Sequence, residues 1–110
     1  REQAVAEVAD DVLEMTKEYG IATVVALQIN REYVKRPDKR PRLSDLRESS
    51  RFEHHSHVGL LLHRPGVEDP DEPKNLAEVI IPKNRNGATG LVRLDFNPAQ
   101  NRFTDWKGPR

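Results

Sequence analysis

Two basic segments of this chain have the residue types and the spacing to bind polyanions. The first is the segment 39–53, KRPRLSDLRESSRFE, which is rich in guanidinium and hydroxyl groups. The second is the segment 83–87, KNRNG, in which two cations separated by one residue stand before a glycine. A guanidinium suits phosphate groups because it offers a planar fork of hydrogen-bond donors. The two segments therefore predict a protein that holds polyanions at two separate places.

A third candidate is Gln28, which lies near the end of the apolar run 21–29 and shortly before Asn30 and Arg31. In open α/β sheets, ligands bind beyond the carboxyl ends of the strands. A neutral amide at such a place can donate a hydrogen bond to a phosphate and accept one from an attacking water. Taken alone, a polar residue at the end of a strand is more often only the start of a loop. The role of Gln28 thus depends on its context.

The overall charge and composition limit the classes of function. Lysine plus arginine and aspartate plus glutamate number 18 each, so the formal net charge is zero and a general nucleic-acid binder is disfavoured. Affinity for phosphate must come from local clustering, such as the cations between Arg31 and Arg51, although an ordinary solvated loop would also explain them. Cysteine is absent, so disulfides and thiolate metal sites are excluded. No apolar run approaches the roughly 20 residues of a membrane-spanning helix, and nothing resembles a signal peptide.

The elements that must position these candidates alternate between helix and strand. Residues 2–19 carry apolar side chains at steps of three and four, which predicts a helix, and Gly20 is suited to end it. The run 21–29 is almost continuously apolar and partly β-branched, which is typical of a strand buried on both faces of a parallel sheet. Helix, glycine and buried strand in succession indicate an α/β protein.

The remaining residues predict a long loop, a short helix and several strands. Residues 30–42 have no period and contain two prolines, so they form the loop. The S-x-x-E spacing that starts at Ser50 is typical of a helix start and predicts a short helix to about His57. The pair Asn97-Pro98 implies the turn of an antiparallel hairpin. Strands are expected at 58–63, where the strand would be buried, and at 77–81, 91–96 and 102–106.

Three of these segments resemble the C-terminal half of the RecA-like ATPase domain of DnaB-type replicative DNA helicases. Residues 39–49, KRPRLSDLRES, match the family's KRPMLSDLRES almost letter for letter, and residues 82–90, PKNRNGATG, are similar to AKQRNGPTG. Residues 21–31, IATVVALQINR, are similar to IPVIALSQLNR. The three segments occur in family order, and the resemblance covers nearly the whole chain. It implies an α/β fold: a partial RecA-like domain (P-loop NTPase class) with a mixed sheet, one long N-terminal helix and a C-terminal antiparallel hairpin.

The resemblance also implies roles for particular residues. Gln28 would sense the γ-phosphate of ATP. Arg85 would be an arginine finger supplied in trans to the ATP of the neighbouring subunit, assisted by Lys83. ATP and Mg²⁺ would be the cofactors, a primase and a helicase loader would be further partners, and the protein would be cytoplasmic with no membrane partner. Single-stranded DNA would be held in the central channel of a homo-hexameric ring by three residues of the first basic segment: Arg47, Glu48 and Ser50.

The chain departs from the family pattern at three places. Leu27 replaces a serine, and Ser50 stands where the family usually has glycine, which permits a closer approach of backbone to phosphate. The segment 53–57, EHHSH, differs from the family's EQDAD. Its three histidines could suggest a metal site, but one short helix rarely directs all three at one ion, and no second ligand motif accompanies them. We therefore predict no metal site and expect a solvent-facing or pH-sensitive surface.

Two parts of an ATPase site are absent from these 110 residues. There is no G-x-x-x-x-G-K-[S/T] phosphate loop and no strand that ends in an acid able to organise Mg²⁺. Since the chain starts with arginine, we expect residues 1–110 to be the C-terminal portion of the domain, with both parts upstream, and to be inactive in isolation. The favoured function is part of an ATP-dependent DNA helicase. The alternative is a non-enzymatic, truncated relative that binds single-stranded DNA or regulates a helicase ring. A RecA-type recombinase would share the fold but lacks the SDLRES motif.

Overall fold

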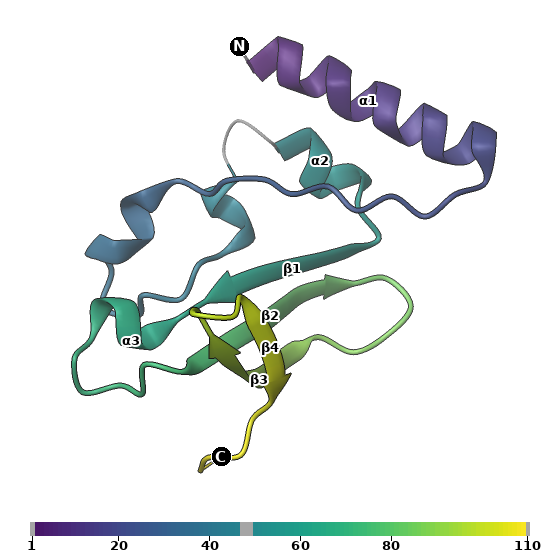
Figure 1. Cartoon of the computed structure of the whole chain (residues 1–110). Coiled ribbons are helices and arrows are strands. Elements are labelled where there is room, and N and C mark those ends of the chain that lie inside the picture. Colours follow the sequence, from purple (N-terminus) through teal and green to yellow (C-terminus); the bar gives the residue numbers. More distant parts are fainter. Residues whose placement is uncertain (1, 47–49, 110) are drawn as a thin grey trace.

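The computed structural model describes residues 2–46 and 50–109. Figure 1 shows a long helix at one end of the molecule, a sheet at the other and an extended segment that connects them. The long loop predicted at residues 30–42 contains one short 3₁₀ helix, η1, and a second 3₁₀ helix, η2, follows directly after it. The elements in chain order are α1 (Glu2–Tyr19), η1 (Arg31–Lys35), η2 (Leu43–Asp45), α2 (Ser50–His55), β1 (Val58–His63), α3 (Pro65–Glu68), β2 (Leu76–Asn84), β3 (Gly90–Asn97) and β4 (Arg102–Asp105).

The four strands form one antiparallel sheet in the order β1-β2-β3-β4. β2 is the longest strand, and it pairs with β1 on one side and with β3 on the other. The four strands predicted from residue 58 onward are confirmed, as is the hairpin through Asn97-Pro98, since β3 pairs antiparallel with β4. The predicted burial of β1 is wrong, because β1 lies at the edge of the described sheet and only Leu61 in it is buried.

The first helix forms as predicted and ends at the predicted glycine. Gly20 has φ +60°, and the amide of Ile21 donates to the carbonyl of Thr16 at 3.3 Å, which is the bond of a Schellman ending. The helix packs on α2 and buries Ala9, but Val8 remains 53% exposed. Its apolar stripe is therefore only partly covered. Neither α1 nor any other helix in the described part of the chain has the length and apolar character needed to cross a membrane.

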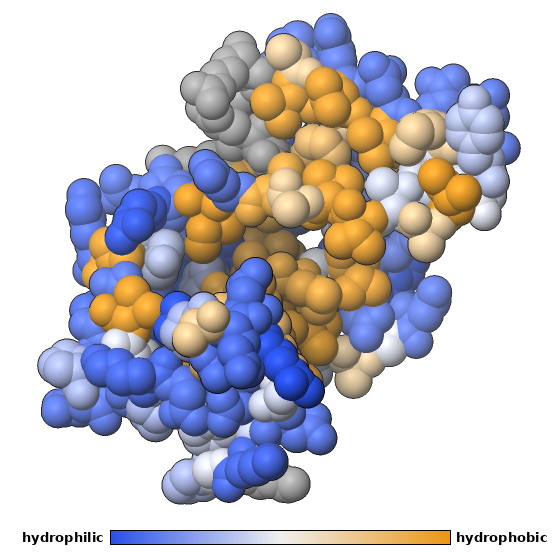
Figure 2. Space-filling view, in the orientation of Figure 1, coloured by the Kyte–Doolittle hydropathy of each residue, from blue (hydrophilic) through white to orange (hydrophobic). Residues whose placement is uncertain are grey.

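The prediction of a buried strand at residues 21–29 is wrong. These residues run as an extended segment between α1 and η1, outside the sheet, and none of them is buried (Figure 1). Val24 is 97% exposed. A strand needs a neighbouring strand to receive its backbone hydrogen bonds, and no described residue pairs with 21–29 in this way. This run was expected to add a parallel strand to a mixed sheet. The described sheet does not contain that strand. Figure 2 shows hydrophobic residues collected on the surface between α1 and the sheet.

The core of the sheet region is small and contains two acids. Leu61 and Leu76 are its large buried apolar side chains, and each is at most 6% exposed. Asp45 and Glu78 are also buried, at 6% and 2% exposure. Because an unpaired buried charge is strongly disfavoured, each carboxylate requires partners of opposite charge. Those partners come from the loop that carries the KRPRLSDLRES motif.

Candidate functional site

The β2–β3 turn is held by hydrogen bonds and leaves the side chain of Arg85 exposed to solvent. The amide of Arg85 donates to the carbonyl of His57 at 2.9 Å, and the Asn84 side-chain amide donates to the carbonyl of Ala88 at 3.1 Å. Gly87 leaves room for the Asn84 side chain in this arrangement, because a Cβ atom there would lie 2.7 Å from Nδ2 of Asn84. Arg85 itself is exposed. The turn can therefore offer a guanidinium to a group outside this chain.

Lys83 points to a different place from Arg85. Its Nζ donates to the carbonyl oxygens of Glu53 and His54 at 2.8 and 3.3 Å, so that the ammonium closes the C-terminal end of α2. A cation is favourable there because helix carbonyls without a partner carry partial negative charge. This contact was missed by sequence reasoning, which paired Lys83 with Arg85 alone. The lysine links the strand that ends at the turn to the helix that follows the SDLRES motif.

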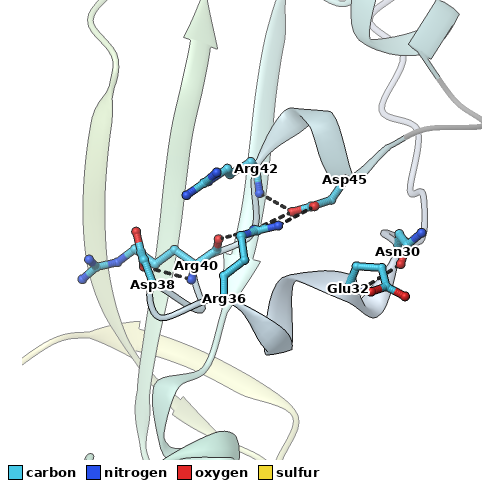
Figure 3. A network of polar contacts seen from close by, with 7 residues as sticks. All are labelled: Asn30, Glu32, Arg36, Asp38, Arg40, Arg42 and Asp45. Carbon is cyan, nitrogen blue, oxygen red and sulfur yellow. Dashed lines mark hydrogen bonds and ion pairs between the residues drawn. The ribbon is translucent and has the colours of Figure 1, made fainter.

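The loop before that motif is stiffened by a network around Asp45 (Figure 3). Nη1 and Nη2 of Arg36 donate to the two carboxylate oxygens of Asp45, each at 3.0 Å, and the amide of Arg42 donates to Oδ2 at 2.7 Å. The hydrogen bond from Arg36 is the main reason that the pKa of Asp45 is lowered, although burial opposes it. The amide of Asn30 also donates to the Asp45 carbonyl at 2.9 Å. Asp45 of the motif therefore stabilises the conformation of the loop.

The same loop is tied to the sheet by a buried carboxylate. Both oxygens of Glu78 on β2 accept from the Arg40 guanidinium, through Nε and Nη2, at 2.9 Å each. His63 on β1, which stands opposite Glu78 in the strand register, places Nδ1 3.0 Å from Oε1. Sequence reasoning missed this cluster. The available signal was a single acid within the otherwise apolar start of the strand, LAEVII.

Two of the three predicted DNA-binding residues, Arg47 and Glu48, lie outside the described residues. Ser50 is the first residue of α2 and is exposed. Gln28 is exposed in the extended segment, two residues before the backbone bond between Asn30 and Asp45. The structure thus brings the Gln28 segment and the SDLRES motif together through backbone contacts.

One histidine of the run, His55, contacts α1. Nε2 of His55 is 2.7 Å from Oδ1 of Asp10, and Nη1 of Arg51 donates to the same carboxylate at 2.9 and 3.0 Å. These two hydrogen bonds, first that of His55 and then that of Arg51, lower the pKa of Asp10. Across residues 2–46 and 50–109, no group of three His, Cys, Asp or Glu side chains could hold a metal ion. One histidine of the run thus belongs to an ion-pair cluster between helices.

Comparison with known sequences gives one family. Residues 1–105 match the model of the DnaB-like helicase C terminal domain. The chain is 41% identical over 100 residues to the replicative DNA helicase DnaB of Haemophilus influenzae, covering 90% of this chain and 21% of that protein. It is 36% identical over 104 residues to the probable plasmid replicative DNA helicase of Chlamydia psittaci, covering 94% of this chain and 23% of that protein. The chain thus spans less than a quarter of the length of these relatives.

Solved structures agree with the sequence comparison. A solved ATPase domain superimposes with a TM-score of 0.92 at 33% identity, covering 97% of this chain and 38% of that one. A DnaB-like replicative helicase whose structure was studied with its interactions with primase gives a TM-score of 0.91 at 34% identity, covering 97% of this chain and 26% of that one. The partial RecA-like fold implied by the resemblance is confirmed. The chain belongs to the family of DnaB-like helicase C-terminal domains.

Proposed function

We propose that this chain is part of a hexameric, ATP-dependent replicative DNA helicase that unwinds duplex DNA by translocating on single-stranded DNA. The observation that carries the proposal is the hydrogen-bonded β2–β3 turn, which exposes Arg85 while strand β2, which leads into it, is bound to both flanks of the SDLRES motif. Strand β2 thus supports both the proposed arginine finger, Arg85, and the proposed DNA-binding loop. The names of the relatives support the same function.

The rest of the ATPase site belongs to a portion of the domain upstream of residue 1. Within these 110 residues there is no phosphate loop, so ATP and Mg²⁺ are bound mainly by residues outside the chain. The exposed apolar side chains of Val24 and Val25 and the open edge at β1 support this view, because such surfaces are normally covered in a folded domain. Residues 1–110 are then the C-terminal portion of a larger domain.

In this proposal Arg85 acts on the ATP of the neighbouring subunit. A planar guanidinium can neutralise charge that develops on the transferring phosphoryl group. Gln28 acts as the γ-phosphate sensor within its own subunit, where an amide can both donate and accept. Lys83 is the proposed helper of the finger, and in this structure its ammonium donates to the α2 carbonyls of Glu53 and His54.

Arg47, Glu48 and Ser50 hold the DNA backbone in this proposal. A single guanidinium with backbone amides can follow phosphates without reading bases. The partners are single-stranded DNA and neighbouring copies in a homo-hexameric ring, with a primase and a helicase loader in the cytoplasm. The solved DnaB-like relative studied with primase supports the primase contact.

The test is an Arg85→Ala substitution in the full-length subunit. We expect ATP turnover to fall by about 10³ or more while nucleotide binding is retained, because a finger acts on the transition state. Mixing mutant with wild-type subunits should lower turnover more than in proportion to the mutant fraction, since the residue acts in trans. Arg102→Ala, which removes an exposed arginine on β4, is the matched control and should have no such effect.

Near-normal turnover of a hexameric Arg85→Ala protein would contradict the finger assignment. A full-length protein that binds single-stranded DNA but hydrolyses no ATP, with or without Arg85, would instead support the non-enzymatic relative.

A further inference from the structure

We propose that Glu78 is a positioning residue that couples the proposed DNA loop to the strand bearing the finger. This inference rests on the proposed function. Through Arg40, Glu78 fastens the segment 36–46 to β2, so that displacement of the loop that follows this segment is passed to Arg85 at the far end of the same strand.

The contact between Glu78 and Arg40 joins residues 38 positions apart in the sequence. Two parallel hydrogen bonds of 2.9 Å fix the guanidinium in the plane of the carboxylate, and such bidentate pairs fix orientation as well as distance. The Glu78 side chain is 3% exposed, whereas that of Arg40 is 45% exposed. The Glu78 carboxylate is therefore buried within the sheet, and the Arg40 guanidinium reaches it from the loop.

His63 completes the cluster from the neighbouring strand. Its side chain is 10% exposed, and Nδ1 donates its proton to Oε1, because an ionised carboxylate can only accept. Burial is the largest influence on the pKa of Glu78 and would raise it, but the hydrogen bonds from Arg40 and His63 together hold the pKa below its ordinary value. Glu78 is consequently charged at neutral pH and keeps Arg40 in place.

The segment between Arg40 and residue 46 can transmit a displacement because it is internally braced. Arg36 donates to the carbonyl of Arg40 at 3.0 Å and to both oxygens of Asp45, which in turn holds the amide of Arg42. Figure 3 shows the side chains of Arg36 and Asp45 meeting across the loop, together with the backbone groups of Arg40 and Arg42 that they contact. Movement at the Asp45 end is thereby carried to Arg40, and from Arg40 to Glu78.

The other flank of the proposed DNA loop is bound to the same strand. α2 starts at Ser50, and its last carbonyls accept from Nζ of Lys83, five positions after Glu78 on β2. β2 is thus attached before and after residues 47–49 and continues directly into the turn with Arg85. A buried ion pair often contributes little net stability compared with apolar side chains. We infer that this one is suited to fixing the register between loop and strand.

The experiment is a double-mutant cycle with Glu78→Gln and Arg40→Gln in the full-length helicase. Hexamer assembly, thermal midpoint, basal ATP turnover and turnover with a single-stranded oligonucleotide are measured for each protein. The ratio of stimulated to basal turnover should fall by about fivefold or more in each single mutant, the lower end of typical couplings between sites. The double mutant should show the same ratio as the lower single mutant, because both changes break one contact.

Lys35→Gln is the matched control, because it breaks an exposed ion pair with Glu32 in the same loop. Its ratio should equal that of the unsubstituted protein. His63→Leu is the milder variant, which removes one donor and leaves the Arg40 contact; it should lower the ratio in the same direction. This variant gives the answer if the Glu78→Gln protein does not assemble.

An unchanged ratio in assembled mutants, with only the thermal midpoint lowered, would overturn the coupling role. Additive losses of stimulation in the double mutant would also overturn it, because the two residues would then act separately. Absence of DNA stimulation in the unsubstituted helicase would contradict the proposed function itself, and the coupling with it.

Discussion

At the scale of single residues, several side chains of the family motifs hold the fold together. Asp45 of the SDLRES motif accepts from Arg36 and from the backbone of Arg42, and Lys83 closes the end of α2. The sequence places Asn86-Gly87 in the turn that carries Arg85, and this pair of residues is common in turns. The sequence could not predict the contacts of Asp45, Lys83 or Glu78. Those depend on which cation the tertiary fold brings near, and the charged residues of this chain offer many pairings.

The Asp10 cluster leads to a prediction on pH dependence. Hydrogen bonds from His55 and Arg51 lower the folded-state pKa of Asp10. A lowered carboxylate pKa contributes stability above the ordinary aspartate value, about 3.9, and this contribution is lost as the pH falls through the lower folded-state value. We therefore expect the wild-type protein to melt at a higher temperature than Asp10→Asn at neutral pH. The difference should shrink as the pH falls below the ordinary value.

The matched control is Asp11→Asn, which changes an exposed neighbouring acid on α1. Thermal melting of all three proteins over a series of pH values checks the prediction. If Asp10→Asn and wild type differ by the same amount at every pH, the titration of Asp10 does not contribute to the stability of the contact between the two helices.

At the scale of elements, β2 organises the molecule. It pairs on both sides, supplies two of the large or charged buried side chains, Leu76 and Glu78, and ends in the Arg85 turn. The strands were predicted because β-branched and apolar runs between turn residues are reliable local signals. The run 21–29 carries the same signal, yet it is not a strand here. Apolar composition indicates that a segment tends to be buried, but it does not indicate which other residues bury it.

Gly66 on α3 gives a prediction about packing between elements. A Cβ atom at this position would overlap the carbonyl oxygen of Pro73 and lie 3.0 Å from Cα of Lys74, just before β2. Both are backbone atoms, which cannot move without displacing the strand. Gly66→Ala should therefore destabilise the protein by about 1–3 kcal/mol, the usual cost of overpacking. The free energy of unfolding, measured by denaturant titration, checks this.

Gly59→Ala is the control for this substitution. Its Cβ would meet only side-chain atoms, Cδ2 of Leu43 at 3.3 Å and Cβ of Lys83 at 3.7 Å. Since Leu43 can shift by rotation, the destabilisation should be smaller. Equal stability of wild type and Gly66→Ala would mean that the approach of α3 to the turn before β2 is looser than described.

At the scale of the whole molecule, the chain has one well-formed sheet and one partly uncovered apolar surface. Exposed apolar side chains include Val8 of α1 and Val24 of the extended segment. Figure 2 shows hydrophobic residues gathered between α1 and the sheet. The family was predictable because three motifs occur in order, and motif recognition does not require knowledge of packing. The arrangement of the segment 21–29 was not predictable, because an apolar run does not reveal whether a neighbouring strand will pair with it, and no described residue does so.

The central proposal is that this chain supplies the DNA-binding loop and the arginine finger of a helicase. The salt dependence of DNA binding tests it most directly. The measurement is the affinity of the full-length hexamer for single strands of several sequences over a range of salt concentrations. Arg47→Ala is compared with wild type and with Arg102→Ala.

A residue that contacts a phosphate releases a counterion on binding, so Arg47→Ala should lower the slope of log affinity against log salt by about one unit. The loss of affinity should be uniform across sequences, basal ATP turnover should survive, and strand separation should be lost. An unchanged slope in a folded, hexameric Arg47→Ala protein would contradict the account.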